Sequence, residues 1–341
     1  MIKITSFGYH SNKYFSLNKI ELPLYNSGTM CLSGKIENYN KKDEPVKDVY
    51  VKLYYGENIN VVNEYLEKNQ NDISINSFDN IVVARTSTNK EGKYSLNINK
   101  NGQYMIVFTK DEYFLEKHTF TISNIKSSSN MYLGTLPLIS LFNSGKIAVR
   151  LDWDTKPPDL DLACRFEVKK NLYCYTFFGN KKCVASEYFL DYREPNEISS
   201  EIIEISEFSE YVYLFYVRKF FDNTNGKTLN ENKKDGVEVG EYKNYTDMSI
   251  KYNEYLNNSM ARLLIYSNGF KVPALKISIP GFIENADNDN STEFNYWAGF
   301  CINGKEGINS LKVVNQMMKG EPPKDLCLSY YNKNNLLTFS D

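Results

Sequence analysis

The chain has little of what most enzymes and nucleic-acid-binding proteins need. Only two histidines, His10 and His118, occur among its 341 residues. It contains no G-x-S-x-G turn, no phosphate-binding loop and no G-x-G-x-x-G turn, so neither serine–histidine catalysis nor nucleotide binding has a motif to support it. The formal net charge of −2 argues against a nucleic-acid or membrane-surface partner. We therefore expect a protein that is not an enzyme.

Long hydrophobic runs are also missing. Residues 1–25 alternate polar and apolar side chains and lack the hydrophobic segment of a signal peptide. The apolar run 133–142 contains Gly134 and Pro137 and is too short to span a bilayer. The sequence thus predicts no direct membrane insertion and a place in the cytoplasm or on an intracellular structure, with secretion as the alternative.

Cysteine is sparse, with six residues in the chain: Cys31, Cys164, Cys174, Cys183, Cys301 and Cys327. They form no C-x-x-C pair and no histidine-containing zinc spacing. Free, buried thiols are the favoured interpretation, because reduced cysteine packs as a small apolar side chain. Cys174 and Cys183 flank an expected hairpin and would pair in an oxidising compartment.

What the chain does have is a globular composition, with 42% hydrophobic and 14% aromatic residues. Short stretches of alternating or β-branched residues, separated by Gly, Asn and Asp turns, predict strands. In the first half these stretches are 31–37, 48–55, 81–88, 92–98, 102–109, 117–123 and 131–138. In the second half they are 146–153, 160–168, 172–178, 182–190, 201–206, 211–220, 260–266, 275–280 and 296–302.

The predicted fold class is all-β: two tandem antiparallel β-sandwiches with a short C-terminal helix and tail. We expect an N-terminal arm (1–27), a first sandwich (28–140), a second sandwich (144–305) and a terminal segment (306–341). The helix is expected over 308–319, where Leu311, Val314 and Met318 share one face.

Two polar insertions interrupt the sandwiches, at 58–80, with a short helix expected over 62–68, and at 222–258. The stretch 211–217 is apolar at both parities. It predicts either a central strand covered on both faces or an apolar outer patch for a partner or for the helix at 308–319.

One acidic turn organises the functional hypotheses. The stretches 146–153 and 160–168 are expected to be adjacent strands that bury their apolar parity together around Pro157-Pro158. The other parity then gathers Asp152, Asp154, Asp159 and Asp161 on one surface.

Clustered carboxylates raise one another's pKa unless a cation offsets their charge. Calcium does so with six to eight oxygen ligands. Asp152, Asp154, Asp159, Asp161 and Asp191 are therefore the candidate calcium ligands. The alternative is a solvated face in which Arg150, Lys156 and Arg165 neutralise the acids. A glycosidase pair is not expected, because neighbouring acids on one exposed turn lack a cleft.

The first half resembles the carboxypeptidase regulatory-like, transthyretin-like β-sandwich family. The resemblance covers about residues 31–138, through SG-x-I, PVKDVYVKLY, ARTSTNKEGKYSLNI and NGQYMIVFTKDEYF. The matching positions are Gly34, Pro45, Val49, Val51, Thr88, Gly92, Tyr94, Gly102 and Tyr104. The resemblance implies a structural or interaction module without catalytic residues of its own.

The second half resembles a widespread sandwich domain marked by W-x-x-x-P-x-D-L-D, distantly similar to pre-peptidase C-terminal domains. Here the motif starts at Trp153, and CYTFFGNKKC, EIIEI, YVYLFYV, ARLLIYS and YWAGFCING fit later segments of that family. Two positions depart from it: Ala163 stands where the family commonly has His, and Leu190-Asp191-Tyr192-Arg193 keeps one acid of an L-D-x-D pattern.

The function expected from the sequence is that of a non-catalytic tandem β-sandwich scaffold or protein-interaction protein in a larger intracellular assembly, with calcium as a candidate stabiliser. Its partners are expected to be proteins, bound through the insertions, the arm and the tail. The alternatives are an extracellular adhesin or carbohydrate-binding module, which would bind glycans, and the accessory domains of a separate hydrolase.

Overall fold

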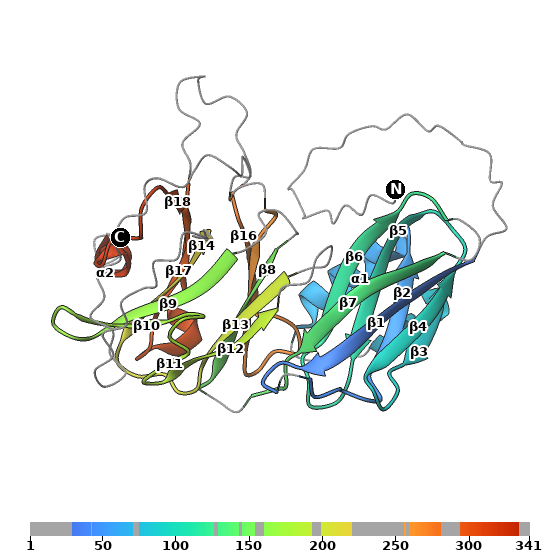
Figure 1. Cartoon of the computed structure of the whole chain (residues 1–341), viewed down its shortest axis with the longest axis horizontal. Helices are drawn as coiled ribbons and strands as arrows, with labels where there is room; N and C mark the ends of the chain where they lie inside the picture. The colour runs from blue at the N-terminus through green and yellow to red at the C-terminus, as the bar shows by residue number, and fades with distance from the viewer. Residues whose placement is uncertain are drawn as a thin grey trace, which may run out of the picture. The chain divides into compact units, whose positions relative to one another are not determined.

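The computed structural model describes residues 29–41, 43–70, 75–125, 129–142, 145–153, 160–192, 199–219, 256, 259–280 and 294–333, with the side chains of 75–77, 190–192 and 332–333 left out (Figure 1). The chain divides into two compact units. The first comprises Met1–Leu141 together with Gly269–Val272, and the second comprises Phe142–Asn268 together with Pro273–Asp341.

The first unit is a sandwich of a three-stranded and a four-stranded sheet, ordered β4-β1-β7 and β3-β2-β5-β6. Its strands are β1 (Met30–Asn38), β2 (Tyr50–Tyr55), β3 (Ala84–Ser87), β4 (Lys93–Ile98), β5 (Gly102–Thr109), β6 (Glu116–Ile122) and β7 (Asn130–Leu138). The core between the sheets takes one parity of each strand, including Leu32, Val51, Leu96 and Ile106. All pairs are antiparallel except β1 and β7, which run parallel.

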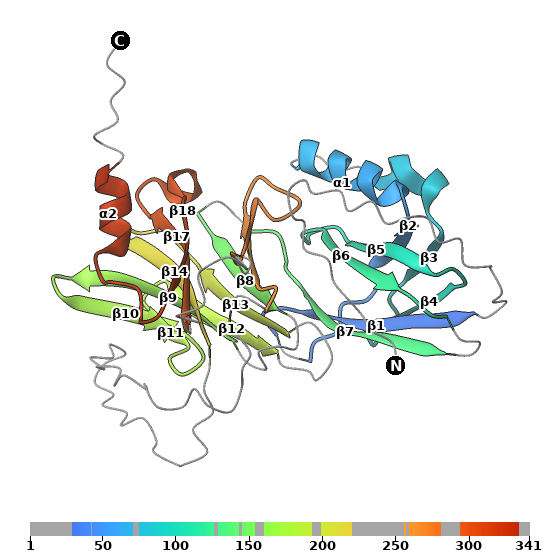
Figure 2. The same cartoon turned by 90° about the horizontal axis from the view of Figure 1, so that it is seen from above.

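The polar insertion of the first unit folds onto the sandwich. Helix α1 (Asn58–Lys68) and the 3-10 turn η1 (Ile75–Ile81) follow β2, and Figure 2 shows α1 lying over the four-stranded sheet. Ile59, Val62 and Leu66 of α1 pack on the sheet face opposite the core, where Val272 joins the same apolar cluster. The helix expected within this insertion is therefore confirmed, and it serves as a cover for the sheet.

The second unit is a larger sandwich of two sheets, ordered β10-β9-β14-β17-β18 and β11-β12-β13-β8-β15-β16. The five-stranded sheet contains β9 (Leu160–Lys169), β10 (Leu172–Thr176), β14 (Val212–Lys219), β17 (Tyr296–Asn303) and β18 (Lys312–Met318). The six-stranded sheet contains β8 (Ile147–Trp153), β11 (Lys182–Cys183), β12 (Ser186–Tyr192), β13 (Ser199–Ile205), β15 (Arg262–Ser267) and β16 (Leu275–Ser278). Trp153, Leu162, Phe215 and Trp297 lie in the core between them.

The prediction of a helix over 308–319 is wrong. A 3-10 turn, η3 (Gly307–Ser310), leads into strand β18, which pairs antiparallel with β17. A strand forms here because 312–318 carries two adjacent β-branched valines, and because its backbone can form hydrogen bonds with the edge of β17. The C-terminal helix instead is α2 (Leu326–Lys333), in the segment expected to be a tail.

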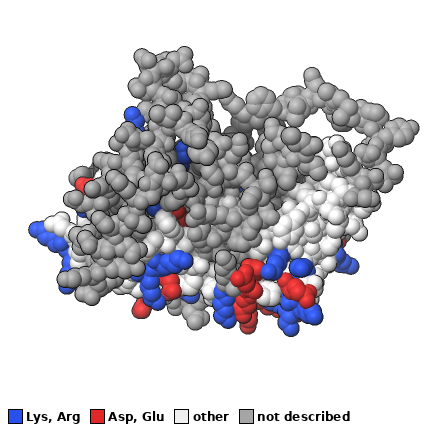
Figure 3. Space-filling model, viewed as in Figure 1, with Lys and Arg blue, Asp and Glu red and all other residues white. Residues whose placement is uncertain are grey.

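The all-β sandwich fold expected from the sequence is confirmed. The N-terminal arm (1–27) and nearly all of the insertion 222–258 lie outside the described residues. No helix in the described ranges is both long and apolar enough to cross a bilayer. On the face seen in Figure 3, basic and acidic side chains of the described residues are interspersed, so neither sign gathers into a patch there.

Candidate binding site on the second sandwich

The two described carboxylates of the acidic turn, Asp152 and Asp161, do not lie on one surface. Strands β8 and β9 belong to different sheets: β8 pairs with β13 and β15, and β9 pairs with β10 and β14. Leu151 and Leu162 both enter the core between the sheets, so Asp152 and Asp161 point outward from opposite sheets. Expecting these strands to be adjacent in one sheet was wrong, because they lie in opposite sheets and meet only through the core.

Asp152 is a buried acid in an ion-paired cluster on the outer face of the six-stranded sheet. Its side chain is almost fully buried, with Arg150 Nε at 3.0 Å and Arg262 Nε at 3.4 Å. The Ser200 hydroxyl donates to its Oδ1 at 2.7 Å. Arg150 thus neutralises Asp152, as the solvated-face alternative expected, but the pair is buried and not solvated.

Asp161 occupies a separate buried pair on the outer face of the five-stranded sheet. It is fully buried, and Arg218 Nε donates to its Oδ2 at 2.7 Å. The Arg218 guanidinium also lies 5.3 Å and 5.4 Å from the ring centres of Phe177 and Phe178. Of the acidic-turn aspartates, Asp152 thus lies beside Arg150 and Arg262, and Asp161 lies beside Arg218.

The other candidate calcium ligands are not described: residues 154 and 159 lie outside the described ranges, as does the side chain of Asp191 on β12. Among the side chains that are described, no group of three or more His, Cys, Asp or Glu residues could hold a metal ion. Asp152 and Asp161 do not share one calcium shell, because they lie on the outer faces of different sheets. The calcium hypothesis consequently depends on Asp154, Asp159 and Asp191.

The outer face of the five-stranded sheet is the better candidate site. Strand β14 is central, between β9 and β17, so the prediction of a strand covered on both faces is confirmed. Its outer residues Leu214 and Tyr216 form an apolar cluster with Leu326 and Cys327 of α2. The cover therefore comes from α2 and not from a helix at 308–319.

Arg165 is the polar centre of this face. Its guanidinium is almost fully buried and contacts the segment before α2, with Nη1 3.0 Å from Glu321 Oε1 and Nη2 2.7 Å from the carbonyl oxygen of Pro323. The Tyr216 hydroxyl donates to the same Glu321 oxygen at 3.3 Å. These bonds attach the chain that precedes α2 to strands β9 and β14.

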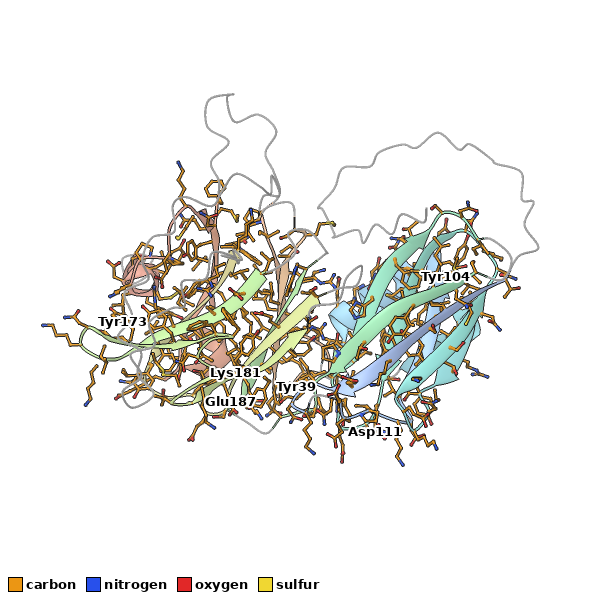
Figure 4. All side chains as sticks on the ribbon, in the orientation of Figure 1. Tyr39, Tyr104, Asp111, Tyr173, Lys181 and Glu187 are labelled. Atoms are coloured by element: carbon orange, nitrogen blue, oxygen red, sulfur yellow. A yellow bond between two sulfur atoms is a disulfide. The ribbon has the colours of Figure 1, made fainter. Side chains whose placement is uncertain are left out.

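A pocket of about 200 Å³ lies beside this attachment. Its floor comes from β9 and from the start of β14, and its rim carries Tyr173 of β10, which Figure 4 labels, and Leu328 of α2. The Lys324 ammonium lies 5.0 Å from the centre of the Tyr173 ring. Burial, and after it the nearby Glu167 carboxylate, raises the pKa of Tyr173.

Four of the six cysteines are paired, which corrects the expectation of free thiols. Cys174 is bonded to Cys183 across the β10–β11 connection, and Cys301 of β17 is bonded to Cys327 of α2. The first pair follows the hairpin that the sequence indicated. The second joins residues that are 26 positions apart and come together only when α2 packs on β17.

Cys164 and His118 are two other described side chains with nucleophilic or basic groups. Cys164 is a free thiol in the core, and burial raises its pKa well above the usual range, so the reactive thiolate is disfavoured. His118 lies on β6 of the first unit and contacts the ring of Phe108. His10 is outside the described residues.

Sequence reasoning missed Arg165, Glu321 and Lys324 as members of one site. The available signal was Arg165 itself, a cation between Cys164 and Phe166 at the outward parity of a strand otherwise rich in apolar residues. Its partners could not be found in this way, because Glu321 lies 156 residues away in the sequence.

No protein-family model matches the chain, and no curated protein matches it either. Among solved structures, the chain is similar to the Bacillus anthracis TIE protein, at 10% identity and a TM-score of 0.22, covering 55% of this chain and 28% of that one. The match thus spans little more than a quarter of the Bacillus protein.

Two further structures are similar to the same degree. A 3-chlorocatechol 1,2-dioxygenase from Rhodococcus opacus 1CP has 10% identity and a TM-score of 0.22, covering 41% of this chain and 73% of that one. A putative carbohydrate-binding protein from Bacteroides uniformis has 10% identity and a TM-score of 0.21, covering 55% and 88%. Likenesses at this level say nothing about the activity of this chain.

Proposed function

We propose that this chain is a non-catalytic binding protein made of two β-sandwiches, and that its second sandwich works in an oxidising compartment. The observation that carries the proposal is the pairing of four of the six cysteines in that unit. Disulfides form and persist in extracellular and similar oxidising environments, and are rare in the cytosol. The binding role is the one expected from the sequence. Of the two locations considered there, the proposal takes the secreted one in place of the intracellular assembly.

The binding surface in this proposal is the pocket beside α2 together with Tyr173 and Tyr211 on its rim. Tyrosine and arginine are enriched at protein interfaces, because they combine apolar contact area with hydrogen-bonding groups. A protein partner that inserts one side chain into a pocket of about 200 Å³ fits this surface.

A glycan is the second candidate ligand, and the half-exposed rings of Tyr173 and Tyr211 favour it. The apolar face of a sugar ring packs on an aromatic side chain, and Arg165, Glu167 and Lys324 in the same lining supply hydrogen bonds to hydroxyl groups. This version corresponds to the carbohydrate-binding alternative.

The two family resemblances are part of the proposal. For the first sandwich, support comes from Gly34, which packs directly against Tyr94, and from Gly92, whose φ of +73° favours glycine. For the second, support comes from Trp153, which is buried in the core at the start of the W-x-x-x-P-x-D-L-D motif. These contacts give the motif residues a structural role.

The oxidising compartment is tested by counting thiols in the full chain purified from its native source without reductant. After denaturation in iodoacetamide, intact mass and peptide mapping are expected to show two alkylated cysteines, Cys31 and Cys164, and two bonded pairs. Six alkylated cysteines would reject the oxidising compartment.

The binding surface is tested by cross-linking the oxidised full chain to its native surroundings and, in parallel, by applying it to a glycan array. Tyr173→Ala is expected to abolish whichever binding the wild type shows, since it removes one wall of the pocket. Tyr132→Ala is the matched control, because Tyr132 is an exposed tyrosine of the first unit. Equal binding by both variants would place the surface elsewhere.

A further inference from the structure

Helix α2 cannot be stable without the sheet beneath it. Its described part, Leu326–Lys333, spans eight residues, and isolated helices shorter than about 12–15 residues are marginal in water. Its order therefore depends on docking. If the docking contacts are lost, α2 is expected to unfold and not to move away as an intact helix.

Three kinds of contact dock α2. Leu326 and Cys327 pack on Leu214 and Tyr216 of the sheet. The Arg165 guanidinium binds the preceding segment through Glu321 and Pro323. The covalent contact is the Cys301–Cys327 disulfide, which ties the first turn of α2 to strand β17.

All four bonded cysteines are buried, but the two disulfides have different surroundings. Cys174 and Cys183 both belong to the core cluster between the sheets. Cys301 is fully buried, but Cys327 lines the pocket of about 200 Å³, beside Lys324 and Leu328. The pocket therefore leads a small thiolate to the Cys327 side chain, and its lining carries the Lys324 cation as well as the Glu167 and Glu210 carboxylates.

We propose that the Cys301–Cys327 bond is a reducible latch, and that the pocket is the route by which a dithiol reductant reaches it. A reductant thiolate attacks the Cys327 sulfur and forms a mixed disulfide, while the Cys301 sulfur leaves as a thiolate and takes up a proton. The second thiol of the reductant then displaces Cys327, and the reductant becomes its own cyclic disulfide. Two electrons and two protons pass to the protein, which gains two thiols.

Reduction has a structural consequence at the outer face of the five-stranded sheet. Loss of the bond leaves α2 held by its apolar contacts, by Arg165 and by the Tyr331 hydroxyl, which donates to the Ser310 carbonyl oxygen at 2.9 Å. Without the covalent tie these contacts no longer keep so short a helix ordered, and it frays and undocks. Leu214, Tyr216 and Ala298, which form one cluster with α2, become accessible. Reduction of the Cys301–Cys327 bond thus converts a covered face of the sheet into an exposed apolar face. This inference rests on the disulfide pairing that also carries the proposed function, but its test follows reduction of one bond and not partner binding, so the two can fail separately.

The test uses the full chain, titrated with dithiothreitol at mild alkaline pH without denaturant. Samples are alkylated with iodoacetamide and mapped by mass spectrometry, and amide exchange of α2 is followed in parallel. The expected result is that Cys301 and Cys327 become alkylated at reductant concentrations that leave Cys174–Cys183 intact, and that the amide of Ser329, which donates to Asp325, loses its protection as they do.

Two variants make the test specific. Lys324→Gln removes the cation at the pocket and is expected to slow reduction of Cys301–Cys327 several-fold, whereas Leu328→Trp fills the pocket and should slow it further. Lys182→Gln, an exposed lysine near the other disulfide, is the control and should change nothing. Reduction of both disulfides only after unfolding would overturn the proposal, as would full α2 protection after Cys301 and Cys327 are alkylated.

Discussion

Single buried residues decide how the carboxylates of the second sandwich behave. Asp152 has two arginines and a serine hydroxyl around it, and Asp161 has one arginine. A buried carboxylate needs such partners, because the loss of its hydration is costly. The acids therefore act as structural parts of the outer faces of their sheets.

Replacing Asp152 tests this structural role. Asp152→Asn removes the carboxylate charge that faces the buried Arg150 guanidinium, so the free energy of unfolding is expected to fall by about 3 kcal/mol. Chemical denaturation measures the change, with and without calcium, and the loss should be the same in both. Glu187→Gln breaks an exposed pair with Lys182 and should cost less than about 1 kcal/mol. A loss seen only with calcium would instead make Asp152 a metal ligand.

A second residue-scale prediction concerns Gly34 of the first sandwich. A Cβ at this position would collide with the hydroxyl and ring of Tyr94 on the neighbouring strand. Gly34→Ala is therefore expected to lower the free energy of unfolding by about 1–3 kcal/mol, as overpacking does in other cores. In Gly320→Ala the added methyl meets open space, and no comparable loss should follow. If both variants unfold alike, the close packing of Gly34 on Tyr94 is not what requires glycine.

At the scale of elements, the hairpin between β11 and β12 carries local strain. Its two-residue turn, Val184-Ala185, gives Val184 a φ of +50°, which disfavours β-branched side chains. A positive φ at the first turn position favours glycine. The adjacent Cys183 is held by its disulfide, so the turn is fixed from a neighbouring position.

Val184→Gly is expected to raise the free energy of unfolding of the second unit by about 1 kcal/mol, because relief of the left-handed conformation exceeds the entropy cost of glycine. Thermal unfolding of the oxidised chain measures it. Ala185→Gly is the control: Ala185 does not have a positive φ, so only the entropy cost applies and stability should fall slightly. Destabilisation by both changes would show that the turn is not strained.

The C-terminal elements show how pairing partners override local patterns. Residues 308–319 have apolar side chains at helical spacing, yet 312–318 forms a strand because the edge of β17 is available to it. The helix lies in 326–333 instead, where Leu326 and Cys327 bury themselves on β14. Both choices depend on a sheet assembled from distant segments.

At the scale of the whole molecule, buried tyrosines set the alkaline limit of stability. Burial, assisted by the Asp79 charge, raises the pKa of Tyr54 to about 12 in the folded protein, against an ordinary value of 10.0. Between these values the unfolded chain releases the tyrosine proton and the folded chain keeps it. Stability is therefore unaffected below pH 10 and falls as pH rises from 10 towards 12.

Tyr54→Phe removes this loss. The Tyr54 hydroxyl is buried and has no hydrogen-bond partner among the described residues, so its removal should leave the free energy of unfolding at pH 7 unchanged or raise it by about 1 kcal/mol. The decline above pH 10, measured by denaturation at a series of pH values, should become shallower. Tyr104→Phe should also flatten the decline but cost about 1 kcal/mol at pH 7, since Tyr104 donates to the Lys100 carbonyl at 2.6 Å. An unchanged alkaline decline in Tyr54→Phe would contradict the assignment.

The sequence by itself determined the all-β class, most strand positions and the helix within the first insertion, and it left a central β14 as one of two alternatives. These follow from side-chain periodicity, which is a local property of the chain. Tertiary structure alone decided that β8 and β9 belong to opposite sheets, that Arg165 binds Glu321, and that Cys301 bonds to Cys327. Each of these depends on which segments pack together, and residues 26 to 156 positions apart leave no local pattern from which such contacts can be read.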